Sequence, residues 1–248
     1  MTGTNHGGSP SIAEPDYWWY RARSELLRVS LEEYVGQPSR TLDVGSADGP
    51  SVGWLTDVGK VSLDIDPRGL DSGGVCGSVL DLPFRDTTFD VVTAFDVIEH
   101  CAPEQRALAE LRRVLVPGGR LLASVPAYQW AWTRHDVDNG HHRRYTRKRL
   151  VTALQSSGFA VERVTYAFSS VFPFFAAERL ARRVLERAQK QPSDGPADVV
   201  GVPHVAPSVE RLLMALTRFD ERLLASRDLP FGSSVFVAAT KLDSGQTG

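Results

Sequence analysis

Short apolar runs alternate with a stretch of helical periodicity from residue 41 onward. The apolar runs are bounded by turn-forming residues, as buried strands usually are, and cover residues 40–44, 61–65, 90–95 and 119–126. Between the last two runs, Leu108, Leu111 and Leu115 recur on one face of a helix, which Pro117-Gly118-Gly119 would end. Because strands that alternate with helices build parallel sheets through right-handed crossovers, the pattern predicts an α/β sandwich.

The pattern differs at the two ends of the chain. Helical spacing occurs at 16–35 and in two amphipathic stretches at about 173–190 and 207–226, and strand-like runs occur at 159–167 and 233–241. A segment rich in Pro, Gly and Ser at 191–208 predicts a loop between the two late helices. We therefore expect one domain over 15–243, flexible tails at 1–14 and 244–248, and a helical insertion at about 168–231 before the last strand.

The composition is that of an ordinary globular protein. Hydrophobic residues make up 42% of the 248 residues and charged residues 23%, which excludes a disordered, collagen-like or disulfide-scaffold protein. The net charge of −2 gives no field that would favour nucleic acid. Cys76 and Cys101 lack metal-ligand spacing and indicate a reducing, cytoplasmic location. Residues 1–14 do not resemble a signal peptide, and no apolar run reaches the roughly 18 residues of a spanning helix.

A candidate nucleotide site follows the first predicted strand. The segment TLDVGSADGP (41–50) places Asp43, Gly45 and Gly49 at the end of that strand, where small residues let the backbone turn sharply and approach a ligand. Asp64 lies about 20 residues further on, at the end of the second strand, where a carboxylate can bind the two hydroxyls of a ribose. A Gly-rich turn followed by an aspartate is also compatible with a tight connection alone.

Five motifs follow one another in a fixed order along the chain. They are LDVGSADG (42–49), SLDID (62–66), GSVLDLPF (77–84), FDVVTAFDVIEH (89–100) and ELRRVLVPGGRLLASVP (110–126). Together they resemble the class I S-adenosylmethionine-dependent methyltransferases, of the small-molecule, type 11-like kind with an LPF motif. The resemblance runs from about residue 40 to 167, and the last strand at 231–241 also fits. It implies S-adenosyl-L-methionine as cofactor and a Rossmann-like α/β/α sandwich, whose seven-stranded sheet is mostly parallel with an antiparallel last strand.

The resemblance also implies roles for individual residues. The positions that match the family's cofactor site are Asp43, Gly45, Ser46, Ala47, Gly49, Asp64, Ile65, Ser78, Val79 and Asp96. Asp43 would lie near the cofactor's ammonium group, Asp64 would bind the ribose, and Ile65 would pack on the adenine. Two positions depart from the family pattern, because Ser78 stands where many relatives have Asp and Ala47 where the fingerprint usually has Gly.

Acceptor sites in this fold lie beyond the carboxyl ends of the strands, where two segments of the chain emerge. The first is DVIEH (96–100), in which His100 is a candidate base or orienting residue, or else a capping or core histidine. The second is 127–150, in which His135 and Asp136 are a candidate general-base pair, or else order the loop. No cysteine assists these histidines, and we expect no metal ion.

Aromatic and basic residues predict the walls of an acceptor pocket. The candidates are Tyr20, Tyr128, Trp130, His141, Arg143, Arg144 and Tyr145. The aromatic run 17–20 predicts that the first helix folds over the cofactor mouth, or else packs on the sheet. Because basic residues outnumber acidic ones between 134 and 149, and Arg143 and Arg144 precede an expected helix start, we expect the acceptor to carry an anionic group.

The acceptor class follows from a motif that is missing. No Asn/Asp-Pro-Pro-Tyr follows the fourth strand, which argues against methylation of amides or base amino groups and favours a hydroxyl on a secondary metabolite, sugar or lipid-linked compound. Two alternatives remain open. The chain could keep fold and cofactor for a non-methylating reaction such as cyclisation, or it could be a cofactor-binding regulator without catalysis.

The late helices suggest further contacts. Four arginines, at positions 179, 182, 183 and 187, are compatible with a solvated face, a weak membrane-surface contact or a cover over a lipid-like substrate. An apolar stripe along 209–224 predicts packing on the partner helix or on a second copy of the chain, as in a homodimer.

Overall fold

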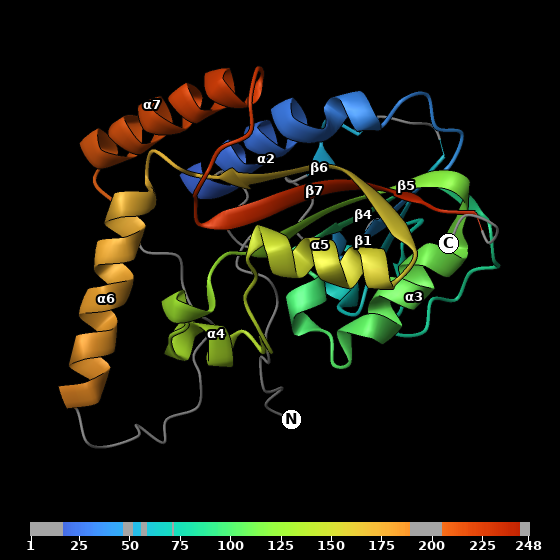
Figure 1. Cartoon of the computed structure of the whole chain (residues 1–248), viewed down its shortest axis with the longest axis horizontal. Coiled ribbons are helices and arrows are strands. Elements are labelled where there is room, and N and C mark those ends of the chain that lie inside the picture. Colours follow the sequence, from blue (N-terminus) through green and yellow to red (C-terminus); the bar gives the residue numbers. More distant parts are fainter. Residues whose placement is uncertain (1–16, 47–51, 56–58, 71, 189–204, 244–248) are drawn as a thin grey trace.

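A seven-stranded sheet forms the centre of the protein (Figure 1). The computed structural model describes residues 17–46, 52–55, 59–70, 72–188 and 205–243. The strands are β1 (Thr41–Val44), β2 (Lys60–Asp64), β3 (Val75–Cys76), β4 (Phe89–Phe95), β5 (Leu115–Pro126), β6 (Phe159–Ala167) and β7 (Ser234–Lys241). They lie in the order β3-β2-β1-β4-β5-β7-β6. Neighbours from β3 to β5 are parallel and β7 is antiparallel to both its neighbours, which confirms the expected mostly parallel sheet with an antiparallel last strand.

Helices cover both faces of this sheet. They are α2 (Trp18–Leu31), α3 (Glu104–Val114), α4 (Arg134–Asp138), α5 (Arg147–Ser156), α6 (Phe172–Ala188) and α7 (Pro207–Leu224). In Figure 1, α2 and α7 lie on one side of the sheet, and α3 and α5 lie on the other. The result is the expected α/β/α sandwich. The predicted tails at 1–14 and 244–248 lie outside the described residues, as does the predicted loop up to residue 204.

Two strand predictions were incomplete. The sequence analysis missed β3, because a strand of two residues is too short to show an alternating pattern. It also began β5 at residue 119, whereas Leu115 already pairs with Phe89 and the segment 117–119 lies within the strand. The pairing register between β4 and β5 shifts after Phe89, and Gly118 has a positive φ of 71°. The segment 117–119, which the sequence suggested as the end of a helix, is therefore an irregular part of β5 that contains glycine.

The two late helices lie between β6 and β7, as expected, but they do not pack as a pair. Instead α7 packs against α2, so the expected partner helix was wrong (Figure 1). Asp220 of α7 is buried and accepts hydrogen bonds from the backbone N–H of Ser170 (3.0 Å) and from its hydroxyl (2.6 Å), which ties α7 to the start of α6. Burial raises the pKa of Asp220. Packing of a second copy of the chain stays a prediction.

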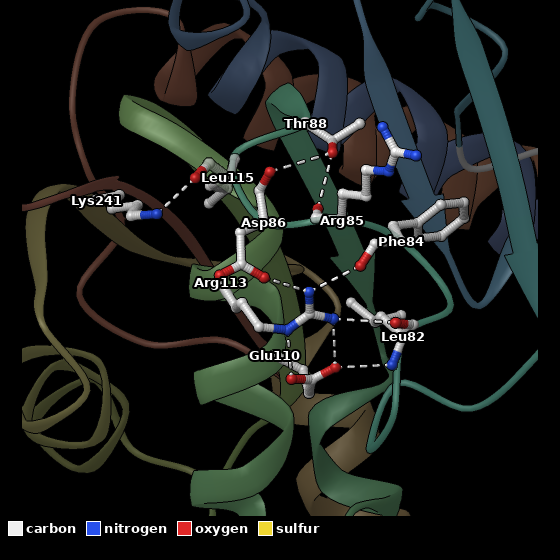
Figure 2. A network of polar contacts seen from close by, with 9 residues as sticks. All are labelled: Leu82, Phe84, Arg85, Asp86, Thr88, Glu110, Arg113, Leu115 and Lys241. Carbon is white, nitrogen blue, oxygen red and sulfur yellow. Dashed lines mark hydrogen bonds and ion pairs between the residues drawn. The ribbon is translucent and has the colours of Figure 1, made fainter.

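A satisfied polar network fixes the segment between β3 and β4 (Figure 2). The guanidinium of Arg113 on α3 donates to the carbonyls of Leu82 (3.0 Å) and Phe84 (2.7 Å). It also pairs with Glu110 (2.7 Å) and Asp86 (2.8 Å), and Glu110 accepts from the backbone N–H of Leu82 (2.8 Å). The Leu-Pro-Phe turn is thereby fastened to α3, which orders the chain that leads into β4.

Among the described residues, no helix combines the length and the apolar character that crossing a bilayer requires.

Candidate functional site

The turn after β1 is held in a shape that only glycine adopts easily. Gly45 has a φ of +75°, and a Cβ atom built on it would lie 2.4 Å from Cγ2 of Val97. Its backbone N–H donates to the carbonyl of Leu63 at 2.8 Å. The glycine therefore lets the β1 turn lie directly against the segment that follows β4. This contact brings the predicted cofactor turn and the predicted acceptor segment 96–100 to the same edge of the sheet.

Polar groups beside this turn fit a bound nucleotide. Asp43 is 2% exposed on β1 and accepts from the hydroxyl of Thr93 at 2.6 Å. The hydroxyl oxygen of Ser46 is buried and has no hydrogen-bond partner among the described residues. A buried hydroxyl without a partner is uncommon in folded proteins and is compatible with a polar ligand at this turn. Ala47 and Gly49 lie outside the described residues.

The ends of β2 and β3 present the features expected for a ribose and an adenine. Asp64 ends β2, and its Oδ1 accepts from the backbone N–H of Asp66 at 2.7 Å, which orients the carboxylate. Ile65 follows directly and is 77% exposed. Ser78 accepts from the N–H of Leu80 at 3.2 Å, and Val79 is buried. An oriented carboxylate beside an exposed apolar side chain fits a nucleoside, so these residues fit S-adenosylmethionine.

Asp96 is held at the carboxyl end of β4. Its backbone has a φ of 55°, which non-glycine residues seldom adopt. One carboxylate oxygen pairs with Arg23 of α2 at 2.8 Å, and the other accepts from the hydroxyl of Ser124 at 2.9 Å. Arg23 is 2% exposed and lies over the ring of Trp19. The pair therefore anchors α2 to the site edge.

Two histidines that are far apart in sequence meet at this edge. The rings of His100 and His141 lie edge to face, with centroids 4.6 Å apart. Nδ1 of His141 is 2.9 Å from Oδ1 of Asp136. Because a carboxylate can only accept, Nδ1 of His141 is the donor in this contact, which leaves Nε2 on the side of the ring that faces away from Asp136. Desolvation of its ring and the neighbouring His141 lower the pKa of His100 to about 4, so its imidazole is neutral at pH 7.

The partner of Asp136 is therefore different from the one the sequence suggested. Asp136 lies in α4, where it pairs with His141 and Arg144 rather than with the adjacent His135. Burial alone would raise the pKa of Asp136, but the hydrogen bond from His141 and the charge of Arg144 hold it well below its usual range. Burial also lowers the pKa of His135. The proposed catalytic role of the His135–Asp136 pair stays a prediction.

Glu99 lies beside these histidines and was absent from the sequence predictions. Its side chain is 1% exposed, and neither carboxylate oxygen has a hydrogen-bond partner in the described part of the chain. Burial and the nearby Asp96 raise the pKa of Glu99 well above its usual value. One ligand atom each from Glu99, His100 and His141 lie within 4.8 Å of one another. The only sequence signal for this position was its place in the motif DVIEH.

Residues 127–147, named the acceptor loop after their predicted role, are held in place by hydrogen bonds between residues of the loop itself. Tyr128 donates its N–H to the carbonyl of Tyr145 (2.7 Å), and Tyr145 donates its own to Pro126 (2.9 Å). The Arg144 guanidinium donates to Asp136 (2.7 Å) and to the carbonyl of Ala127 (3.2 Å).

Arg144 is 5% exposed and Tyr145 is fully buried, with its hydroxyl donating to Glu104 at 2.5 Å. Both lie in the loop's interior, next to the bridge between Ala127 and Tyr145, and their expected contact with an acceptor stays a prediction.

Aromatic side chains and α6 cover the acceptor loop. Tyr128 stacks with Trp130 (5.8 Å) and Tyr166 (5.2 Å), and Trp130 is 39% exposed. Burial raises the pKa of Tyr128. Tyr20 of α2 is buried beside Trp19. These positions agree with a pocket wall, although contact with an acceptor stays a prediction.

The arginines of α6 partly point back to this loop. Arg179 donates to the hydroxyl of Thr133, and Arg183 donates to the carbonyl of Trp130 at 3.3 Å. Arg182 instead pairs with Glu178 on the same helix, and the side chain of Arg187 is not described. Two of the four arginines therefore contact the acceptor loop, while Arg182 and Arg183 are exposed. A cover over a lipid-like substrate stays a prediction. A membrane-surface contact stays a prediction.

Comparison with known proteins agrees with this fold. Residues 42–123 match the model of a methyltransferase domain family. A protein of Mycolicibacterium smegmatis, named a probable S-adenosylmethionine-dependent methyltransferase, is 28% identical over 168 residues, which cover 62% of this chain and 63% of that protein. The chain thus spans less than two thirds of this relative's length.

Two solved structures share the architecture. The [4+2]-cyclase SpnF has a TM-score of 0.54 at 20% identity and covers 88% of this chain and 80% of its own. The N-methyltransferase NodS from Bradyrhizobium japonicum, solved with S-adenosyl-L-homocysteine, has a TM-score of 0.51 at 17% identity and covers 66% of this chain and 86% of its own. At these identities the likeness establishes the fold alone.

Proposed function

Because the chain belongs to the class I S-adenosylmethionine-dependent methyltransferases, we propose that it transfers a methyl group to a hydroxyl of a small molecule. The observation that carries this proposal is the contact between His100 and His141, whose ring centroids lie 4.6 Å apart. His100 belongs to the segment after β4 whose Val97 lies against the turn at Gly45. Two imidazole groups at this edge of the sheet suit an acceptor whose proton must leave. A secondary metabolite, a sugar or a lipid-linked compound would supply such a hydroxyl.

Residues at the ends of β1 and β2 would hold the cofactor. The backbone at Gly45 and the hydroxyl of Ser46 face the methionine end, Asp64 binds the ribose hydroxyls, and Ile65 packs on the adenine. When bound, S-adenosylmethionine supplies an electrophilic methyl group on a sulfonium. The chain's own task is then to hold the acceptor oxygen in line with that methyl group and to receive the proton of the hydroxyl.

The acceptor would lie between the His100–His141 pair and the aromatic wall of Tyr128 and Trp130. Nε2 of His141, whose ring is oriented by the contact of Nδ1 with Asp136, would receive the hydroxyl proton. Arg143 is the candidate for an anionic group on the acceptor, although it also donates to the carbonyl of Cys101 at 2.6 Å. A cytoplasmic location and a homodimer remain predictions.

Formation of S-adenosylhomocysteine with a panel of acceptors tests this function. The panel contains hydroxyl compounds and amines, each with and without a phosphate or carboxylate group. We expect turnover with hydroxyl acceptors, faster when they are anionic, and its loss in His141→Ala. Turnover confined to amines, or a converted acceptor without release of S-adenosylhomocysteine, would contradict O-methylation, and the second result would identify a reaction such as cyclisation. Cofactor binding without conversion of any acceptor would point to a regulator.

Asp64 gives a separate test of the cofactor site. A charged acceptor that faces two ribose hydroxyls contributes roughly 1.5–3 kcal/mol, so Asp64→Ala should weaken S-adenosylmethionine binding about 10–150-fold in calorimetry. Asp66→Ala is the matched control, because Asp66 pairs with Arg68 and its backbone N–H to Asp64 survives the change. Equal affinity of the two variants would contradict the assignment of Asp64.

A further inference from the structure

The His–Glu cluster, formed by Glu99, His100 and His141, combines three groups that bind metals in other proteins. Each contributes one ligand atom, and these atoms lie within 4.8 Å of one another. Ligands about 2.0–2.1 Å from a zinc ion in tetrahedral geometry are roughly 3.4 Å apart, so a small side-chain rotation would close the set. Two imidazoles and one carboxylate are a common ligand set for catalytic first-row metals, with positions left open for a substrate.

Glu99 is the observation that singles out this cluster. Its carboxylate is 1% exposed, yet both oxygens lack a hydrogen-bond partner in the described part of the chain. Burying a carboxylate without a partner is costly, so such groups in folded proteins are paired or bind a metal. The nearby arginines do not fill this role, because Arg144 is bound to Asp136 and Arg23 is bound to Asp96.

His141 is oriented as a metal-binding histidine usually is. Nδ1 of His141 is 2.9 Å from Asp136, which directs Nε2 away from that carboxylate. Metal-binding histidines typically donate their second nitrogen to a carboxylate or a backbone carbonyl in this way. The ring of His100 lies edge to face against that of His141, with centroids 4.6 Å apart. The backbone also holds the two segments together, because the N–H of His142 donates to the carbonyl of Glu99 at 2.8 Å.

We propose that Glu99, His100 and His141 bind a divalent first-row metal ion such as Zn²⁺, with Asp136 as a positioning residue for His141. The cluster follows Val97, whose side chain lies against the turn at Gly45, so the ion would lie at the same edge of the sheet as the predicted cofactor turn. There it would bind the hydroxyl oxygen of the acceptor and lower the pKa of that hydroxyl. With Nε2 of His141 bound to the ion, the hydroxyl proton would pass to solvent and not to His141. This role rests on the proposed methyl transfer, whereas binding of the ion does not.

Metal titration of the full chain tests the site without cofactor or acceptor. After chelation and dialysis, Zn²⁺ binding is measured by calorimetry, and Co²⁺ binding by its visible absorption. We expect one ion per chain. The affinity for Zn²⁺ should fall more than about 100-fold in His141→Ala and in Glu99→Gln, because each variant loses a ligand. In Asp136→Asn, which loses only the partner of a ligand, it should fall roughly 10–100-fold. His142→Ala is the matched control and should bind Zn²⁺ like the wild type, because His142 is exposed and lies outside the cluster.

Several outcomes would overturn the site. They are the absence of stoichiometric Zn²⁺ or Co²⁺ binding, equal losses in His141→Ala and His142→Ala, or a preference for Mg²⁺, which favours oxygen ligands. Circular dichroism of each variant separates loss of the site from loss of the fold.

Turnover measurements separate this inference from the proposed function. We expect chelation to stop methyl transfer while S-adenosylmethionine still binds, and Zn²⁺ to restore it. Transfer that continues in chelated protein would overturn the metal's role and leave the methyltransferase intact. Metal binding at the cluster without transfer to any acceptor would overturn the proposed function and leave the site intact.

Discussion

The polar groups around Arg113 hold the segment before the start of β4, and those around Glu99 lie at the segment after its end. The two groups differ in how many of their buried polar atoms have a hydrogen-bond partner. In the first group, the guanidinium of Arg113 reaches two carbonyls and two carboxylates, and Glu110 also accepts from a backbone N–H (Figure 2). In the second group, Asp136 is fully bonded but Glu99 is left without a partner among the described residues. A completed network indicates a structural role, whereas an incomplete one at a strand end indicates a place for a ligand.

The largest effect on stability is expected from Asp136, whose carboxylate makes the completed hydrogen bonds of the second group. Asp136→Asn leaves the buried guanidinium of Arg144 without its counter-charge, and we expect the free energy of unfolding to fall by about 3–5 kcal/mol. Asp138→Asn is the control, because Asp138 pairs with Arg134 at the surface and should change stability by less than about 1 kcal/mol. Chemical denaturation measures both. Similar losses in the two variants would show that burial of Asp136 is not decisive.

Arg113 tests whether the completed network is purely structural. Arg113→Gln removes charge-assisted bonds that fasten the Leu-Pro-Phe turn, so we expect a loss of about 2 kcal/mol in unfolding free energy. Cofactor affinity should stay within about twofold of the wild type, since Arg113 contacts none of the cofactor-site residues. Arg106→Gln is the control, because exposed Arg106 makes one bond of this kind, to the carbonyl of Leu80. A large drop in cofactor affinity in Arg113→Gln alone would remove the contrast between the two groups.

Glu99 should respond with the opposite sign. Replacing an unpartnered buried carboxylate by an apolar side chain of similar size removes a penalty, so Glu99→Met should raise the unfolding free energy of the metal-free protein by about 1 kcal/mol. Glu104→Met provides the matched comparison and should lower it by about 1–3 kcal/mol, because Glu104 is buried but accepts from Tyr145 and Arg149. If Glu99→Met is instead as destabilising as Glu104→Met, Glu99 has a structural partner.

The smallest expected effect is a pH dependence within the first group. The hydrogen bond from Arg113 lowers the pKa of Glu110. An acid whose pKa is lowered by folding stabilises the protein above its unfolded pKa of about 4.3, and this contribution is lost as the pH falls through the folded pKa. The difference in unfolding free energy between wild type and Glu110→Gln should therefore be constant near pH 7 and shrink below about pH 4.3. A difference that does not change between pH 7 and pH 3 would show that the shift is absent.

Much of the fold followed from the sequence because the signals are local. The buried strands β4 and β6 and the helix starts near residues 147 and 207 show in runs of adjacent residues, since burial alternates with the period of the element itself. The cofactor edge was also readable, because Gly45 and Asp64 each end a strand and the ends of parallel strands meet. The packing of α7 against α2 could not be predicted from the sequence, because an apolar stripe shows that one face of a helix is buried but does not identify the element that covers it.

The sequence by itself determined most of the sheet and the positions of Gly45 and Asp64 at strand ends, whereas only the tertiary structure decided which groups meet at the predicted acceptor site. His141 pairs with Asp136 rather than with a sequence neighbour, and it meets Glu99 and His100 because the acceptor loop folds back after β5 and lies against the end of β4. Tyr145 and Arg144 turn inward for the same reason. The sequence states the chemical nature of each side chain. Its protonation, burial and ligands depend on partners from distant segments, and only the packing of those segments decides which partners it has.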